Sequence, residues 1–250
     1  MSTPTSSVSR RALIAAIAVA PFVAASPASA ASLSVQLWAT RSGGETLDAP
    51  DGAGNPYATQ LIALLDEGAD PLPALAAQLC DRTRFATHDF QIPETVPARF
   101  ASSWRVALRP RREKRVALVL TNADYAASDA AQSLPGAARD GVRIADALTR
   151  AGFSVMRAHD VSREALPGVL RNFARTSSRA DVAFLYSTGH GVEVDGVQYS
   201  LFGDHSVADG VAGLSRAARW NEIAASARAR KLNLTVWAGC RNNPFAATHG

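Results

Sequence analysis

Hydrophobic and polar positions alternate from Ser34 to Thr40, which is the period of a half-buried β-strand. Leucines three and four positions apart then predict one helix over residues 55–68 and a second that starts near Asp70. Residues 91–97 are predicted as a loop, and a short strand is expected from Trp104 to Leu108. This first part offers two strands and two helices, which is too little to close a core alone.

From residue 116 onward, predicted strands and helices alternate. Val116–Leu120 and Val182–Tyr186 are continuous apolar runs, as expected of strands buried on both faces of a parallel sheet. The other elements expected are helices at 136–150, 166–173 and 215–229, strands at 153–156 and 232–237, and a hairpin at 192–201 that turns at Asp195-Gly196. The first of these helices is expected to bury Ala138, Val142, Ala145 and Leu148. The alternation predicts an α/β fold, a three-layer sandwich with a mostly parallel central sheet.

The first thirty residues have the pattern of an export signal. Arg10 and Arg11 precede an apolar run from Ala12 to Ala25, and Ala28-Ser29-Ala30 supplies the small residues that a signal peptidase needs. The run is shorter than the ~20 apolar residues that span a bilayer, so no stable membrane span is expected after cleavage. The segment also resembles a twin-arginine signal. We therefore expect residues 1–30 to be a signal peptide and the mature protein to be exported, periplasmic or secreted.

Composition narrows the expected partners. Hydrophobic residues make up 47% of the 250 residues and charged ones 19%, which suits a compact folded chain. The formal net charge of +4 is spread along the sequence, without the continuous basic stripe and aromatic residues of a nucleic-acid groove, so no nucleic acid is expected. The sequence has no phosphate-binding glycine motif and no metal-ligand cluster. We expect no cofactor and leave calcium activation open.

Two glycine-flanked motifs follow predicted buried strands. Ser187–Gly191 contains His190, and Ala238–Pro244 contains Cys240. Open α/β sheets place their active sites at the carboxyl ends of parallel strands, and a thiol beside an imidazole is suited to attack a carbonyl. The motifs therefore predict a cysteine–histidine pair at one edge of the sheet. The other cysteine, Cys80, lies on the apolar face of a predicted helix and is expected to pack in the core.

The region around these motifs, residues 114–245, resembles the large-subunit part of the bacterial caspase-like and metacaspase-like cysteine peptidases. The matching pieces are residues 115–122, 134–140, 186–196 and 240–245. The separation of 50 residues from His190 to Cys240 also matches the roughly 50 typical of caspases. The resemblance implies that Cys240 is the nucleophile and His190 the general acid and base. It also implies an oxyanion hole formed by the N–H groups of Gly191 and Cys240, with proteins or peptides as substrates.

The order of the matching pieces departs from the family. A small-subunit part normally follows the catalytic cysteine, whereas here residues 35–59 and Ser102 onward resemble that part and come first. The resemblance therefore implies a circularly permuted caspase-like fold whose first strand lies in the same sheet as the strand at 232–237. The expected parts are a small-subunit-like part at 31–108, a linker at 109–114 and a large-subunit-like part at 115–250, with 31–250 as one domain. A truncated tandem is the alternative.

Substrate preference is the second departure. Metacaspase-like relatives carry Asp two residues before the cysteine, where it helps to bind a basic side chain, but this sequence has Ala238. Asp140 matches another acidic position of that pocket, and Glu45 lies in a loop expected to face it. The resemblance thus implies a cysteine endopeptidase that cleaves after a basic residue. The alternative is a catalytically weak or inactive pseudopeptidase that binds peptides. The sequence lacks the G-x-S-x-G elbow of serine hydrolases.

Overall fold

The computed structural model describes residues 32–48, 54–68, 71–102, 104, 113–125, 133–203 and 207–245. The expected signal peptide and most of the expected linker lie outside these residues. The elements are β1 (Leu33–Trp38), α1 (Pro56–Glu67), α2 (Leu72–Ala86), β2 (Glu94–Val96), β3 (Arg115–Thr121), α3 (Pro135–Arg150), β4 (Ser154–His159), α4 (Leu166–Ser177), β5 (Val182–Thr188), β6 (Gly191–Val194), β7 (Val197–Ser200), η1 (Val207–Arg216), β8 (Ala218–Arg219), α5 (Trp220–Ala224) and β9 (Leu232–Trp237).

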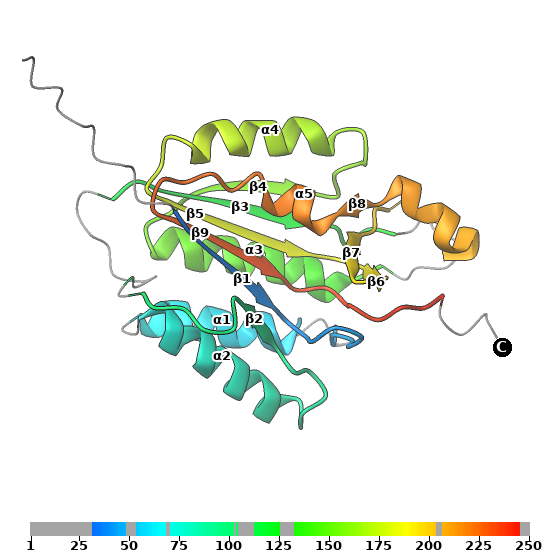
Figure 1. The fold of residues 1–250 in the computed structure, drawn as a ribbon, viewed down its shortest axis with the longest axis horizontal. Helices are drawn as coiled ribbons and strands as arrows, with labels where there is room; N and C mark the ends of the chain where they lie inside the picture. Colours follow the sequence, from blue (N-terminus) through cyan, green and yellow to red (C-terminus); the bar gives the residue numbers. More distant parts are fainter. Residues whose placement is uncertain are drawn as a thin grey trace, which may run out of the picture. The chain divides into compact units, whose positions relative to one another are not determined.

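A six-stranded sheet with the strand order β2-β1-β9-β5-β3-β4 forms the centre of the fold. Five of its strands run parallel, and β2 alone is antiparallel to its neighbour. Every residue of β3, β5 and β9 is buried, because helices cover both faces of the sheet. Helices α1, α2 and α3 pack on one face, and α4 and α5 pack on the other (Figure 1). The predicted α/β sandwich with a mostly parallel sheet is confirmed.

The two ends of the described chain meet in this sheet. Strand β1 pairs with β9 in parallel over six positions, from Leu33 opposite Leu232 to Trp38 opposite Trp237. The prediction that the first strand lies in the same sheet as the strand at 232–237 is therefore confirmed, and the two strands are direct neighbours. In Figure 1, β1 lies beside β9, although the two strands have the colours of opposite ends of the sequence.

The antiparallel edge strand differs from the prediction. Residues 94–96 pair with β1, where a loop was expected. Trp104, the start of the expected strand, instead lies outside any strand, and its carbonyl accepts the N–H of Leu72 at 2.8 Å; residues 105–108 lie outside the described residues. Strand β2 has only three residues between Pro93 and Pro97, so it is too short to show alternation, and prolines are tolerated at such an edge.

Two helices also differ from the prediction. Helix α3 leaves Val142 42% exposed and buries Ile144 and Asp140 instead. The reason is that the backbone of Gly141 lies against the Thr121 side chain of β3, which turns the neighbouring Val142 outward. The helix expected over 215–229 is reduced to α5, because β8 pairs with β7 and becomes the third strand of a small sheet.

The same small sheet begins with a hairpin that the sequence predicted. Strands β6 and β7 pair in antiparallel register around Asp195 and Gly196, whose φ angles are 51° and 74°. Positive φ at both central residues is typical of a type I′ turn. The hairpin starts one residue after His190. Its pairing with β7 therefore fixes the direction of the backbone that follows this histidine. None of the helices that the structure describes is long and apolar enough to cross a membrane.

Candidate active site

The carboxyl edge of the sheet brings the two predicted motifs together. His190 follows β5 and Cys240 follows β9, and these neighbouring strands pair from Val182 opposite Leu232 to Ser187 opposite Trp237. The loops beyond the strands touch. A Cβ added at Gly239 would lie 2.6 Å from the carbonyl oxygen of Gly189. The glycines thus allow two loops to approach more closely than residues with side chains could. That His190 and Cys240 act as a catalytic pair stays a prediction.

Tyr125, a residue that no sequence motif marks, fixes the position of His190. The hydroxyl of Tyr125 accepts the backbone N–H of His190 at 2.9 Å and donates to the carbonyl of Leu201 at 3.2 Å. The two rings also meet edge to face, with centroids 4.5 Å apart. Burial raises the pKa of Tyr125, so the phenol stays neutral and keeps its proton for Leu201. The histidine is therefore held through both its backbone and its ring.

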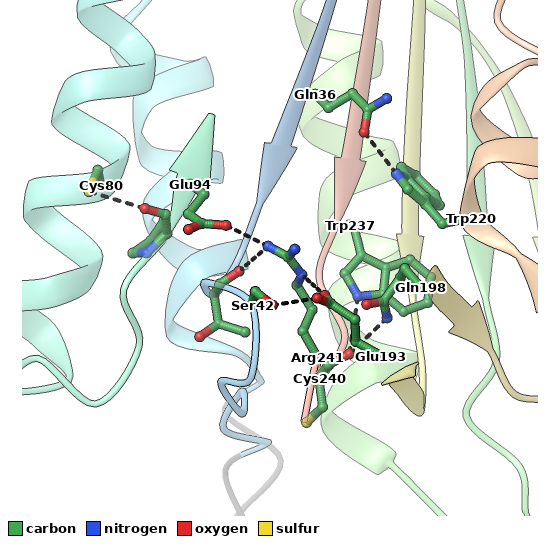
Figure 2. A network of polar contacts seen from close by, with 12 residues as sticks. Gln36, Ser42, Cys80, Glu94, Glu193, Gln198, Trp220, Trp237, Cys240 and Arg241 are labelled. Atoms are coloured by element: carbon green, nitrogen blue, oxygen red, sulfur yellow. Dashed lines mark hydrogen bonds and ion pairs between the residues drawn. The ribbon is translucent and has the colours of Figure 1, made fainter. Parts of the chain in front are cut away.

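The backbone of Cys240 is held by two buried side chains from different strands. Its carbonyl oxygen accepts hydrogen bonds from Nε2 of Gln198 at 2.9 Å and from Nε1 of Trp237 at 3.4 Å (Figure 2). Gln198 lies on β7 and Trp237 ends β9. A carbonyl with two fixed donors cannot rotate away without losing both hydrogen bonds. The cysteine main chain is therefore fixed independently of its thiol.

The thiol of Cys240 lies against one residue from the loop that follows β1. The N–H of Thr46 donates to Sγ at 3.3 Å, and the hydroxyl of Thr46 lies 3.4 Å from the same atom. The carbonyl of Thr46 is 3.8 Å from the sulfur. All three polar groups of one residue thus surround the candidate nucleophile. The residue comes from the small-subunit-like part, 194 positions away in the sequence.

The geometry near Gly191 bears on the expected oxyanion hole. The N–H of Glu193 donates to the carbonyl of Asn242, in the cysteine loop, at 3.0 Å. N–H groups two residues apart on a strand point to the same side, so the N–H of Gly191 also points toward that loop. A Cβ added at Gly191 would lie 3.0 Å from the carbonyl oxygen of Cys240. The role of these N–H groups as an oxyanion hole stays a prediction.

Asp140 lies beneath the cysteine loop, joined to it through Asn55. Its carboxylate accepts the N–H of Asn55 at 2.6 Å and an NH1 hydrogen of Arg143 at 3.3 Å. The Asn55 amide donates in turn to the carbonyl of Ala238 at 3.3 Å. Asp140 is fully buried, and this burial raises its pKa to about 6, against the opposing effects of the Asn55 N–H and the Arg143 charge.

The other predicted pocket residue, Glu45, lies on the surface of the same region. It is exposed, and its carboxylate accepts the amide of Asn242 at 2.8 Å. The sequence did not single out a further acid of this region, Asp48, whose carboxylate accepts a hydrogen bond from the N–H of Gly136 at the start of α3 at 3.3 Å. Burial raises the pKa of Asp48, while the Gly136 N–H and the charge of His190 oppose the rise. The role of Asp140 and Glu45 in substrate binding stays a prediction.

A buried glutamine ties the Thr46 loop to this acidic side of the site. Gln91 accepts the N–H of Leu47 at 3.1 Å and donates to Oδ1 of Asn55 and to the carbonyl of Ala39, each at 3.3 Å. No local motif marks Gln91 or Tyr125. Their partners are distant in sequence, so only the fold identifies them.

The described residues hold two further relevant features. Cys80 is half-buried on α2 rather than packed in the core, with its thiol 3.5 Å from the carbonyl of Pro93, and neither it nor Cys240 is in a disulfide. Within the described ranges, no group of three or more His, Cys, Asp or Glu side chains is placed to hold a metal ion.

Comparison with known proteins decides the family. Residues 114–226 match the family model described as a caspase domain. This segment belongs to the caspase-like family. The match includes His190 and the strands β3, β4 and β5, and it ends before Cys240. No curated protein sequence matches the chain. The caspase domain indicates a cysteine peptidase of the caspase type, which acts on protein substrates.

Proposed function

We propose that the protein is a cysteine endopeptidase with Cys240 as nucleophile and His190 as general acid and base. The observation that carries this proposal is the meeting of the two glycine-flanked loops at the carboxyl ends of the paired strands β5 and β9. Two independent devices, Tyr125 for the histidine and Gln198 for the cysteine, hold the loops in place. Such fixed positions are what nucleophilic catalysis requires of its reacting groups.

The reaction follows the general course of thiol catalysis. The Cys240 thiolate attacks the carbonyl carbon of the scissile peptide, and the carbonyl oxygen becomes an oxyanion that the N–H groups of Gly191 and Cys240 stabilise. The imidazolium of His190 then gives a proton to the leaving nitrogen, the C–N bond breaks, and a thioester remains. Water, deprotonated by His190, attacks the thioester and releases the acid product and the thiol.

Cleavage after a basic residue is the preference that we propose. Asp140 is joined to the cysteine loop through Asn55, and Asp48 is close enough to His190 for their charges to interact. Glu45 lies beside the same loop through Asn242. Carboxylates gathered on one side of the site favour a positively charged side chain before the cut. They offset the lack of an acid at position 238.

Chain organisation and location form a second part of the proposal. We infer a circularly permuted caspase-like domain over residues 31–250, since β1 and β2 extend the sheet beyond β9. The Arg10-Arg11 pair and the Ala28–Ala30 site support removal of residues 1–30 and export, to the periplasm or outside the cell.

Thr46 gives a specific reason to keep the peptide-binding pseudopeptidase as a second candidate. Its three polar groups surround the Cys240 sulfur, which is where a substrate carbonyl must approach. If Thr46 fills that approach, the groove binds a peptide without cleaving it; in the peptidase, the substrate carbonyl enters beside Thr46 while the loop stays in place. The two candidates differ in whether the thiol can react with a bound peptide.

Active-site labelling separates the two candidates. Mature protein is incubated with a peptidyl chloromethyl ketone that carries arginine next to the reactive group, and the labelled residue is located by mass spectrometry. We expect one adduct on Cys240, no adduct in Cys240→Ala and a greatly slowed reaction in His190→Ala. Cys80→Ser is the matched control, since it removes the other free cysteine and should label like the wild type. Wild-type protein that binds the peptide but gives no adduct would favour the pseudopeptidase.

A further inference from the structure

Arg241, the residue after the candidate nucleophile, lies where several separate segments meet (Figure 2). Its Nε donates to Glu193 at 2.7 Å, and its NH1 donates to Glu94 at 2.6 Å and to the carbonyl of Thr40 at 3.2 Å. The guanidinium carbon lies 4.3 Å from the centre of the Trp38 ring. One side chain therefore joins the hairpin that follows His190, the edge strand β2 and the end of β1.

The backbone of Arg241 holds the loop that carries Thr46. Its N–H donates to the carbonyl of Gly44 at 2.8 Å, and its carbonyl accepts the N–H of Gly43 at 3.0 Å. The hydroxyl of Ser42, in the same loop, donates to the Glu193 carboxylate that Arg241 also binds. Loop 42–46 is thus attached to Arg241 through backbone and side chain together. Two residues beyond these attachments, Thr46 contacts the Cys240 sulfur.

Burial and charge make this arrangement specific to arginine. The side chains of Arg241 and Glu193 are only 12% and 9% exposed, whereas Glu94 is 42% exposed. A nearly buried carboxylate that loses its cation is strongly destabilised, so Arg241 and Glu193 depend on each other. A planar guanidinium can donate to two carboxylates and stack on an aromatic ring at once, which a lysine ammonium cannot do.

We propose that Arg241 is the positioning residue of the site, which holds loop 42–46 against the Cys240 sulfur and so sets where a peptide can lie relative to the nucleophile. The inference rests on the proposed peptidase function. Arg241 does not touch the reacting atoms. It acts through the loop and through the backbone of its neighbour, Cys240.

The test compares two reactions of the same thiol. Peptide hydrolysis needs the thiol and the substrate carbonyl aligned with each other, whereas alkylation by iodoacetamide, which forms the carbamidomethyl thioether and releases iodide, needs only a reactive thiol. Mature wild-type protein, Arg241→Gln, Arg241→Lys and Glu193→Gln are assayed for kcat/KM on a fluorogenic peptide with arginine before the cut, and for the rate of Cys240 alkylation. The control is Arg150→Gln. It removes an exposed arginine that forms two hydrogen bonds with Asp66, and neither residue belongs to the His190 or Cys240 motif.

The expected result is a split between the two rates. Arg241→Gln lowers kcat/KM by about 10²-fold, the usual effect of a small misplacement, and leaves the alkylation rate within a few fold of wild type. Arg241→Lys recovers part of the loss, and Glu193→Gln shows the same split to a smaller extent. Arg150→Gln changes neither rate.

Three outcomes would overturn the inference. One is hydrolysis by Arg241→Gln at the rate of the Arg150→Gln control. Another is a fall in alkylation as large as the fall in hydrolysis, which would indicate general loss of structure. The third outcome concerns Glu193→Gln, which replaces Arg241→Gln in the test if the latter does not fold. Equal losses of peptide hydrolysis and of Cys240 alkylation in Glu193→Gln would overturn the inference. Wild-type protein that neither hydrolyses the peptide nor accepts the peptidyl label would instead refute the proposed function itself.

Discussion

Asp140 should make the folded chain less stable as pH rises, and the effect can be isolated by one substitution. The carboxyl is fully buried on α3, and its burial raises the pKa from 3.8 to about 6. The folded state therefore binds this proton more tightly than the unfolded state does. The resulting stabilisation is fully present below pH 4, and it is lost as pH rises through about 6.

The magnitude follows from the size of the pKa change. Each tenfold change in proton affinity corresponds to about 1.4 kcal/mol, so a rise from 3.8 to about 6 corresponds to a total of about 3 kcal/mol. Roughly 2 kcal/mol of this is lost between pH 4.5 and pH 7.5, since part is already lost at the lower pH. Asp140→Asn keeps an oxygen that can accept the N–H of Asn55 but cannot ionise. Its free energy of unfolding should therefore gain about 2 kcal/mol relative to wild type over that interval.

The assay is urea unfolding at pH 4.5 and at pH 7.5, followed by the fluorescence of the four tryptophans. The quantity compared is the free energy of unfolding of the variant minus that of wild type, and the result is how this difference changes from pH 4.5 to pH 7.5. The other groups titrate equally in both proteins and therefore cancel. Asp146→Asn is the matched control: it lies on the same helix but is exposed, and it should change the pH dependence little. If wild type and Asp140→Asn lost stability in parallel as pH rose, the reasoning would be refuted.

Tyr125→Phe removes the acceptor for the His190 N–H and should lower kcat by about tenfold with little change in KM, as measured by peptide hydrolysis; an unchanged kcat would contradict it. Asn55→Ala removes the side-chain cap of α1 and the bond to Ala238, and should lower the free energy of unfolding by about 1–2 kcal/mol in urea; a loss below a few tenths would count against it. Mass spectrometry of protein from its native host should find Ala31 at the amino terminus; intact Met1-bearing protein in the cytoplasm would contradict this.

The central strands could be predicted because their sequences allow few alternatives. Strands β3 and β5 each have seven residues, all of them buried, so the apolar runs at 116–120 and 182–186 mark them directly. The exposed side of α3 could not be predicted in the same way. Hydrophobic spacing favours Val142 as a core residue, but the close contact of Gly141 with the sheet decides the rotation of the helix. A glycine contributes nothing to a hydrophobic pattern, although here its backbone lies against Thr121 of β3.

The residues of the candidate site also fall into two groups, those that local sequence marks and those that only long-range contacts identify. His190 and Cys240 stand at strand ends with glycines beside them, so local sequence and family resemblance both mark them. Thr46, Gln91 and Tyr125 have no such mark, because each acts through a partner that is 36 to 194 positions away. Propensity and periodicity report neighbours within a helix or strand. Neither propensity nor periodicity indicates which two loops will contact each other in the fold.

The large sequence separations around Cys240 have a consequence for when the site forms. Arg241 bonds to the carbonyl of Thr40 across 201 positions, yet the entropy of closing so long a loop grows only by about 0.6 kcal/mol for each doubling of length. The contact therefore costs little in stability. Its cost falls on the folding rate, since long-range pairings form slowly. A chain whose β1 has not yet paired with β9 lacks Thr46, Gln91 and the other contacts that hold the cysteine loop. The complete site therefore exists only after β1 has paired with β9. In partly folded chains, the Cys240 thiol should lack its contacts with Thr46.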